Sequence, residues 1–329
     1  MKGIKVLATG RYAPDNTASN EDFMKIVDTS DEWITTRTGM KVRHISDGEP
    51  TWMMASKAAK RALNKAKMTA DEIDMILITT VTGDFYSPSV ASMVQREIGA
   101  WNAFGMDVNA ACSGFVYGMD TAYRYLITGA AKNVLLVSSE TLSKITDYTD
   151  RSTCVLFGDG AAAAILTLGD GLFSSYLAMD AHDAHVLYAR THDNLNPFST
   201  KGAEHPDGFT GAKDHYLYMD GRAVYKFAVK AMPEAVEKAV ERAGLTLSDI
   251  DFIVPHQANI RIVQTAAKAL GLPMEKFLVN VAEYGNTSSA SIPLCLDEYN
   301  ERGTFRSGDK IVVVGFGAGL TYAAAVFEW

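Results

Sequence analysis

The chain has 329 residues, of which 47% are hydrophobic and 21% are charged, a composition typical of a globular protein with a substantial core. Its formal net charge of −8 argues against a nucleic-acid-binding protein, which usually carries a basic balance or a basic stripe. Three widely spread cysteines form no disulfide framework or zinc motif, and the sequence contains no signal segment and no apolar run long enough to span a bilayer. We therefore expect a soluble cytoplasmic protein that binds neither membranes nor nucleic acid.

In chain order, the first candidate functional residue is Cys112. The segment "FGMDV" (104–108) predicts a short strand, and "SGFVYGMDTAYRYLITG" (113–129) predicts the helix that follows it. Cys112 lies at the turn between them, among small residues, where the positive end of the helix dipole favours a thiolate. The competing interpretation is a buried, inert cysteine, which is the usual finding for this residue type. Cys154, in the predicted strand "TCVLF", and Cys295, in a predicted helix, are expected to be core residues.

Residues 180–222 form an irregular insertion that we expect to cover a pocket. Five of the seven histidines lie in it: His182, His185, His192, His205 and His215. Their spacing matches no compact metal motif and no thiolate supports them, so we predict solvated loop histidines and no metal site.

Three segments of the second half supply partners for a reactive thiol. His256 follows a predicted strand in "VPHQANIRI", at the strand end where open α/β sheets place their ligands. Asn286 lies in the turn "EYGNTSSAS"; a lone histidine or asparagine of this kind is more often structural. Together, a cysteine, a histidine and an asparagine suit acyl transfer through a thioester. The segment "GFGAG" (315–319) precedes a strand rather than a helix, so it predicts a tight turn and not a dinucleotide site.

An internal repeat organises these segments. Residues 62–78 align without a gap with residues 239–255, and "NVLLV" at 133–137 matches "KIVVV" at 310–314 at the same offset (310 − 133 = 177). Two matches in one register predict a duplicated α/β chain, with an N-terminal half at 1–170, a C-terminal half at 171–329 and a site where the halves meet.

Taken together, the chain resembles β-ketoacyl-acyl-carrier-protein synthase III of the thiolase-like superfamily. The resemblance rests on motifs that occur in the same order: "ATGRYAP" (8–14), "VDTSDEWITTRTGM" (27–40), "NAACSGF" (109–115), "DYTDRSTCVLFGDGAAAA" (147–164), "VPHQANIR" (254–261), "YGNTSSASIP" (284–293) and "GFGAGLTY" (315–322). It implies an α/β fold of five layers, αβαβα, made of two duplicated halves that each contain a mixed sheet.

The resemblance also implies an activity: the decarboxylative Claisen condensation of a short acyl-CoA primer with malonyl-acyl carrier protein (malonyl-ACP). The products are 3-oxoacyl-ACP, CO2 and CoA, and the reaction initiates type II fatty acid synthesis. Cys112 would be the acyl-accepting nucleophile, and His256 and Asn286 would bind the malonyl thioester and promote its decarboxylation. The backbone N–H groups of Cys112 and Ala318 would form the oxyanion hole. No metal or other cofactor is implied, because acyl-CoA is a substrate.

Further positions match the family's binding residues. The resemblance implies CoA contacts at Thr29, Trp33, Arg37, Arg151, Gly221, Ala258 and Asn259. It implies a basic patch for the acidic carrier protein at Lys226, Arg261 and Lys268, of which the last two are seven residues apart on one predicted helix. Ser87 would border the acyl pocket across the interface of a homodimer.

Several alternatives stay open. A starter-unit ketosynthase or an acyltransferase of polyketide or specialised metabolism could keep the same three residues on the same fold. A cysteine thioesterase would use Cys112 but would have no need of Asn286 or of a carrier-protein patch, and an intact trio argues against a non-catalytic scaffold. The chain length and branching of the primer are left open, since Ser87 is small while Phe85 and Tyr86 beside it are large.

Overall fold

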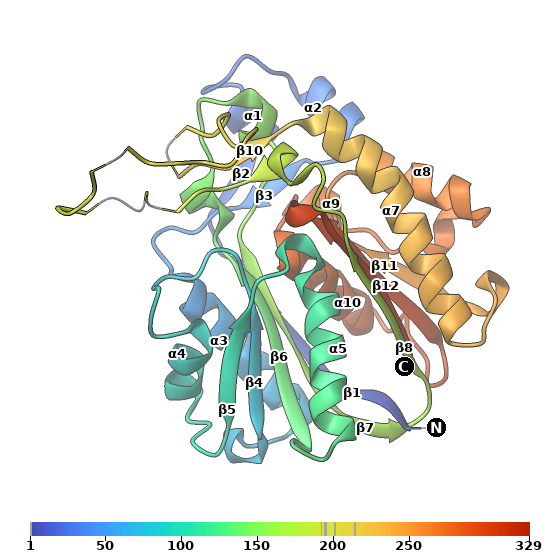
Figure 1. Cartoon of the computed structure of the whole chain (residues 1–329). Helices are drawn as coiled ribbons and strands as arrows, with labels where there is room; N and C mark the ends of the chain where they lie inside the picture. Colours follow the sequence, from blue (N-terminus) through green and yellow to red (C-terminus); the bar gives the residue numbers. More distant parts are fainter. Residues whose placement is uncertain (1, 192, 194–195, 201, 214) are drawn as a thin grey trace.

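The computed structural model describes residues 2–191, 193, 196–200, 202–213 and 215–329. Two sheets run through it, with helices between them and on their outer faces (Figure 1). The first sheet has the strand order β1-β7-β6-β4-β5. Its strands are β1 (Lys2–Tyr12), β4 (Met75–Thr79), β5 (Phe104–Val108), β6 (Asn133–Glu140) and β7 (Gly160–Asp170).

The second sheet has the order β11-β12-β13-β8. Its strands are β8 (Phe173–Met179), β11 (Phe252–Pro255), β12 (Lys310–Gly317) and β13 (Thr321–Glu328). Both sheets are mixed and share one pattern. The pair β4–β6 is parallel and β6–β7–β1 is antiparallel, just as β11–β12 is parallel and β12–β13–β8 is antiparallel.

The longer helices form three layers around these sheets. They are α3 (Thr51–Ala66), α4 (Val90–Ile98), α5 (Gly114–Ile127), α7 (Gly221–Arg242), α8 (Ile260–Leu270) and α10 (Ser291–Glu301). One apolar core joins α5 and α10 to the inner faces of both sheets. A second core packs α3 and α4 on the outer face of the first sheet, and a third packs α7 and α8 on the outer face of the second. The predicted five-layer αβαβα fold with two mixed sheets is confirmed.

Short helices and two short strand pairs complete the fold. The helices are α1 (Asn20–Phe23), α2 (Asp31–Thr38), α6 (Arg151–Cys154) and α9 (Val281–Tyr284), and the strand pairs are β2 (Thr17–Ser19) with β3 (Val42–His44) and β9 (Leu187–Tyr188) with β10 (Tyr218–Met219).

The prediction that Cys154 lies in a strand is wrong. The Asp150 side chain accepts a hydrogen bond from the Ser152 N–H and starts the helical turn α6, although Cys154 is buried as expected.

The 177-residue offset relates several interior elements, although the equivalent strands β7 and β13 begin 161 residues apart (321 − 160). It maps β6 onto β12, the 3-10 turn Ala70–Glu72 onto the turn Leu247–Asp249, and the first residue of α5 onto the first residue of α10. Both 3-10 turns begin with a capping box, Thr69 with Glu72 and Thr246 with Asp249, so equivalent loops enter the two sheets with the same local bonding.

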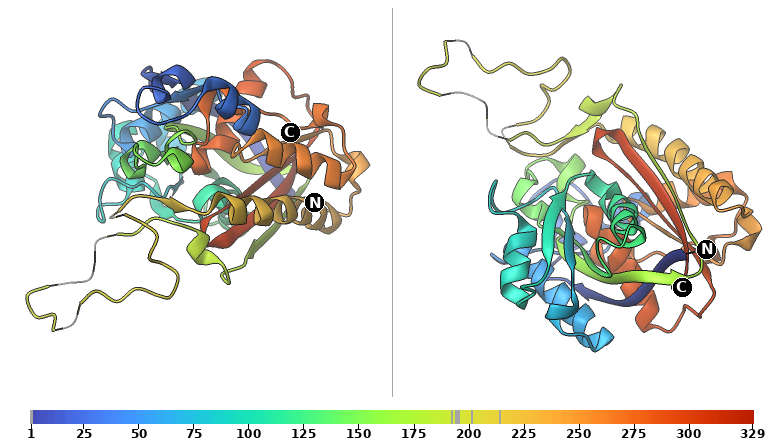
Figure 2. Two further views of the ribbon diagram at one scale, coloured as in Figure 1. Left: turned by 90° about the horizontal axis from the view of Figure 1, so that it is seen from above. Right: turned by 60° about the horizontal axis from the view of Figure 1, so that its bottom comes forward.

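The insertion at 180–222 contains β9 and β10, and its described residues are otherwise mostly irregular. Hydrogen bonds hold the two ends of the insertion in place, and these ends form its base. Within the insertion, the Tyr188 hydroxyl accepts hydrogen bonds from the Gly211 and Ala212 N–H groups, and the Leu217 N–H donates to the Ile145 carbonyl in the rest of the protein. The described part beyond this base projects from the body (Figure 2). His192, one of the predicted loop histidines, lies outside the described residues.

Candidate active site

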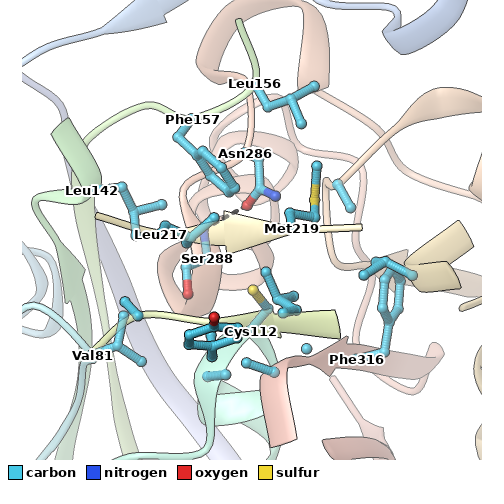
Figure 3. Close-up of a pocket in the computed structure, with 18 of the residues that line it drawn as sticks. Val81, Cys112, Leu142, Leu156, Phe157, Leu217, Met219, Asn286, Ser288 and Phe316 are labelled. Atoms are coloured by element: carbon cyan, nitrogen blue, oxygen red, sulfur yellow. Dashed lines mark hydrogen bonds between the residues drawn. The ribbon is translucent and has the colours of Figure 1, made fainter. Parts of the chain in front are cut away.

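A cavity of about 960 Å³ opens between the two halves and contains the residues that the sequence singled out. Cys112, His256 and Asn286 all line it, together with the backbone turn at Ala318. Apolar side chains surround them, among them Val81, Leu142, Leu156, Phe157, Leu217, Met219 and Phe316 (Figure 3). Leu217 and Met219 come from the insertion, so part of it does cover the pocket.

Cys112 sits in a tight turn between β5 and α5. Ala111 before it has φ 47°, a left-handed conformation that is uncommon outside glycine and that turns the chain sharply into a 3-10 turn (Ala111–Ser113) and then into α5. The half-buried thiol therefore lies at the N-terminal, electropositive end of a 14-residue helix. This placement agrees with the strand-to-helix turn that the sequence predicted for Cys112.

The resting thiol is protonated. Burial raises the pKa of Cys112 to about 12, and the nearby carboxyl of Glu140 acts in the same direction, whereas a hydrogen bond with the Ser288 side chain lowers it. Stabilisation of a negative charge on this sulfur therefore depends on nearby hydrogen-bond donors and on the helix dipole.

His256 follows β11 and is 1% exposed. The backbone N–H of His256 donates to the Val314 carbonyl at 2.8 Å, and the imidazole ring packs edge-on against Phe316. Burial lowers the pKa of His256 to about 3, so the imidazole is neutral at pH 7.

The hydrogen bonds around His256 select its tautomer. Ser291 Oγ lies 2.6 Å from His256 Nδ1 and also accepts a hydrogen bond from the Gln257 N–H at 3.3 Å. When Ser291 donates its proton to Nδ1, the ring proton lies on Nε2. His256 is then a neutral N–H donor in the cavity wall.

Asn286 is oriented in a similar way. Its Oδ1 accepts a hydrogen bond from the Ser288 N–H at 2.9 Å, which turns the oxygen away from other partners and leaves the amide nitrogen as a donor (Figure 3). The side chain is 7% exposed and lines the cavity. His256 and Asn286 thus present two uncharged N–H donors to one space.

The end of β12 abuts the nucleophile turn. A Cβ on Gly317 would lie 2.6 Å from the Cys112 nitrogen, so only glycine allows this approach. Ala318, the next residue, begins a 3-10 turn and lines the cavity. The two backbone segments that the sequence predicted as an oxyanion hole are therefore in contact.

The predicted CoA residues fall into two groups. Trp33, Arg37, Gly221, Ala258 and Asn259 line the cavity, whereas Thr29 and Arg151 do not. The guanidinium carbons of Arg37 and Arg151 each lie 5.2 Å from the centroid of the Trp33 ring, so two cations contact this indole. Asn259 also caps α8, because its side chain accepts a hydrogen bond from the Arg261 N–H.

The predicted carrier-protein residues share one surface. Lys226 lies on α7, Arg261 and Lys268 lie on α8, and all three are exposed. The two helices are neighbours, joined by a hydrogen bond between the Tyr225 and Thr265 hydroxyls. Ser87 is exposed in the loop before α4 and does not line the cavity of its own chain.

Sequence reasoning missed three polar residues of the site: Glu140, Ser288 and Ser291. The 177-residue offset could have found Ser288, because it maps "NAACSG" (109–114) onto "NTSSAS" (286–291). Within the described ranges, no group of three histidine, cysteine or acidic side chains could hold a metal ion, and no described helix has the length and apolarity needed to cross a membrane.

Comparison with known proteins bears on the whole chain. Residues 106–181 match the family model of 3-oxoacyl-[acyl-carrier-protein] synthase III, and residues 240–329 match the model of its C-terminal part. The β-ketoacyl-[acyl-carrier-protein] synthase III of Clostridium acetobutylicum is 48% identical over 331 residues, covering 100% of this chain and 99% of the relative.

Solved structures of members of the same family are also similar to this chain. The crystal structure of 3-oxoacyl-[acyl-carrier-protein] synthase III from Aquifex aeolicus VF5 matches with a TM-score of 0.90 and 40% identity, covering 99% of this chain and 100% of that one. The priming β-ketosynthase of the R1128 polyketide biosynthetic pathway matches with a TM-score of 0.89 and 33% identity, covering 99% of this chain and 96% of that one. The chain therefore belongs to the 3-oxoacyl-[acyl-carrier-protein] synthase III family.

Proposed function

We propose that this chain condenses an acyl-CoA primer with malonyl-ACP and thereby initiates type II fatty acid synthesis. It is an acyltransferase in this proposal, as its family membership implies. The observation that carries the proposal is that one thiol, two neutral side-chain donors and two adjoining backbone turns meet in a single cavity.

In the first half-reaction, Cys112 takes the acyl group from acyl-CoA. The sulfur attacks the thioester carbon, the bond from carbon to the CoA sulfur breaks, and the Cys112 proton ends on the CoA thiol. Negative charge develops on the carbonyl oxygen, and the N–H groups of Cys112 and Ala318 stabilise it. The α5 dipole and the Ser288 hydroxyl stabilise charge on the sulfur, which offsets the effect of its burial.

In the second half-reaction, the malonyl thioester loses CO2. The electron pair of the broken carbon–carbon bond moves into the thioester as an enolate, whose oxygen accepts hydrogen bonds from His256 Nε2 and Asn286 Nδ2. The enolate carbon attacks the acyl-Cys112 carbonyl, 3-oxoacyl-ACP forms, and the released Cys112 sulfur takes up a proton. Both steps balance without an oxidant, a reductant or a metal, so acyl-CoA enters as a substrate and no cofactor is required.

The mouth of the cavity suits the two thioester carriers. Trp33 with the guanidinium groups of Arg37 and Arg151 offers a flat, cationic surface for the adenine and phosphates of CoA, with Thr29, Gly221, Ala258 and Asn259 as further contacts. Lys226, Arg261 and Lys268 form a local positive surface on a chain of net charge −8, and an acidic carrier protein would dock there.

A polyketide starter-unit ketosynthase is the second candidate function. It is favoured by the 33% identity to the priming β-ketosynthase of the R1128 pathway. The two functions share the chemistry and differ in the primer and in the pathway that receives the product.

The test combines acyl trapping with product formation. We expect intact-mass spectrometry to show one acyl adduct after incubation with acetyl-, butyryl- or isobutyryl-CoA, and 3-oxoacyl-ACP to appear once malonyl-ACP is added. The variant Cys112→Ala should form no adduct. The matched control Cys154→Ala should form it as the wild type does, because Cys154 is fully buried away from the cavity.

The outcomes separate the alternatives. An adduct that hydrolyses and gives no 3-oxoacyl product would indicate a thioesterase, and product formed only with long or unusual primers would favour a starter-unit ketosynthase. The charge reversal Lys268→Glu should raise KM for malonyl-ACP, and an unchanged KM would remove α8 from the docking surface.

A further inference from the structure

The turn that contains Cys112 has a structurally equivalent turn in the second half, at Ser288–Ala290. Ala111 and Ser288, 177 residues apart, have φ values of 47° and 50°. Asn109 Oδ1 accepts a hydrogen bond from the Ala111 N–H, and Asn286 Oδ1 accepts one from the Ser288 N–H in the same way. Each turn continues through a 3-10 turn into a central helix, α5 or α10. By this equivalence, Ser289 occupies the position of the nucleophile in the second turn.

The two turns pack against each other. A Cβ on Gly114 would lie 3.0 Å from Ser289 Cβ, so the start of α5 and the second turn are in contact. Ser288, next to Ser289, lines the same cavity as Cys112, and its side chain lowers the pKa of that thiol. Figure 3 shows Ser288 and Cys112 facing the same space. The second turn therefore holds a hydrogen-bonding group against the reactive sulfur.

The residue facing each turn differs between the halves. Gly317 ends β12 and leaves room for the Cys112 backbone, whereas its counterpart at the end of β6 is Glu140. The Glu140 carboxyl is fully buried, and its Oε1 lies 2.7 Å from Ser289 Oγ. One turn is thus open to substrate, and the other is closed by a carboxyl group.

Glu140 is itself held from a second direction. Its Oε2 accepts hydrogen bonds from the Thr82 hydroxyl at 2.6 Å, the Val81 N–H at 3.0 Å and the Thr80 hydroxyl at 3.1 Å. These donors come from the segment that follows β4, and Val81 and Thr82 line the cavity. The carboxyl therefore ties the first sheet to the Ser288–Ser289 turn across the floor of the site.

We propose that Glu140 and Ser289 are positioning residues whose buried hydrogen bond holds the Ser288 hydroxyl on the Cys112 sulfur. They touch no substrate and act through Ser288, which stabilises the thiolate by donating to it. The inference rests on the proposed function only in taking Cys112 as the nucleophile. Its test therefore reads the thiol directly, without acyl-CoA or carrier protein.

The experiment measures the rate of Cys112 alkylation by iodoacetamide against pH in four proteins: wild type, Ser288→Ala, Ser289→Ala and the double variant. Each single change should move the alkylation profile to higher pH and slow alkylation at pH 7 about tenfold, because the thiolate loses its donor. The double variant should be no slower than Ser288→Ala, since Ser289 acts through Ser288.

The control is Ser139→Ala, which removes the hydroxyl of a different buried serine, in β6 next to Glu140. The Ser139 hydroxyl bonds the Thr51 carbonyl instead of the turn, so its profile should match the wild type. A Ser289→Ala profile like that of this control would overturn the proposal, as would a double variant slowed by the product of the two single effects.

A second pair of variants approaches the bond from Glu140 and covers the case in which Ser289→Ala does not fold. Glu140→Gln keeps a hydrogen-bonding group opposite Ser289 Oγ, whereas Glu140→Met leaves this hydroxyl only the Thr79 carbonyl at 3.1 Å; both variants remove any charge. Alkylation should be severalfold slower in Glu140→Met than in Glu140→Gln, and equal rates would contradict a positioning role.

Discussion

His256 has no charge to offer at neutral pH, and this limits what it can do. Its pKa is lowered to about 3 by burial, and Ser291 occupies its Nδ1. A neutral N–H donor assists the condensation half-reaction, in which charge appears on the malonyl thioester oxygen, more than it assists acyl loading. The variant His256→Ala should therefore lose about 100-fold or more of its condensation rate while acyl loading of Cys112 stays within about threefold of wild type.

Two separate assays check this prediction: intact mass for the acyl adduct, and 3-oxoacyl-ACP formation for condensation. The variant His256→Gln is the matched control, because its amide keeps an N–H donor and should recover part of the condensation rate. If loading disappears together with condensation, His256 acts as the base of the thiol, and the assignment to the second half-reaction fails.

At the scale of elements, the duplicated halves were predictable because the sequence repeats in one register. The buried strands β6 and β12 begin 177 residues apart, as their apolar runs indicated, and α8 carries Arg261 and Lys268 on one helix as expected. Cys112 and His256 each follow a strand whose pattern is clear, whereas Asn286 lies in a turn after the short helix α9.

Other features depend on contacts that a local pattern does not contain. The segment around Cys154 is rich in β-branched and aromatic residues, yet the cap at Asp150 makes its first turn helical. Glu140 and Ser289 lie 149 residues apart, and nothing near either residue in the sequence announces the hydrogen bond between them. The 177-residue repeat does indicate that Ser289 is equivalent to Cys112, but only when the turns are aligned as well as the strands.

The contact between β12 and the nucleophile turn gives a prediction at this scale. In Gly317→Ala, the new Cβ would lie 2.6 Å from the Cys112 nitrogen and 3.0 Å from Cys112 Cβ, and both belong to the tight turn that carries the nucleophile. The strand must move away, which opens the oxyanion hole, so acyl loading should fall about 100-fold or more. CoA release in the first turnover measures it.

The control for this variant is Gly202→Ala. A Cβ at Gly202 meets nothing within 4 Å, and its φ lies outside the left-handed region, so loading should equal that of wild type. A Gly317→Ala protein that loads within threefold of wild type would show that β12 does not set the geometry of the Cys112 amide.

At the scale of the whole molecule, the pseudo-symmetry explains why the site is asymmetric. Two equivalent turns meet between the sheets; a glycine opposite Cys112 leaves one open, and Glu140 opposite Ser289 closes the other. In the proposed mechanism, the duplicated fold thus supplies the nucleophile Cys112 from the first half and the hydrogen-bond donors His256, Asn286 and Ser288 from the second.

The exposed edge of the first sheet gives the last prediction, which concerns assembly. β5 is the edge strand, and large apolar side chains stand exposed around it: Phe85 at 55%, Tyr86 at 84%, Trp101 at 67% and Phe104 at 44%. A free strand edge beside such a patch favours pairing with another chain. We expect a homodimer formed through β5, in which the exposed Ser87 would face the acyl cavity of the partner.

Light scattering during gel filtration measures the assembly. Wild type should have twice the chain mass, 71.4 kDa for a chain of 35.7 kDa, and the double variant Trp101→Glu/Phe104→Glu should be a monomer because two buried carboxylates would oppose the interface. The matched control Leu7→Glu changes an exposed apolar residue of the opposite edge strand, β1, and should leave the dimer intact. A monomeric wild type would rule out the β5 interface, and with it the predicted action of Ser87 on primer choice.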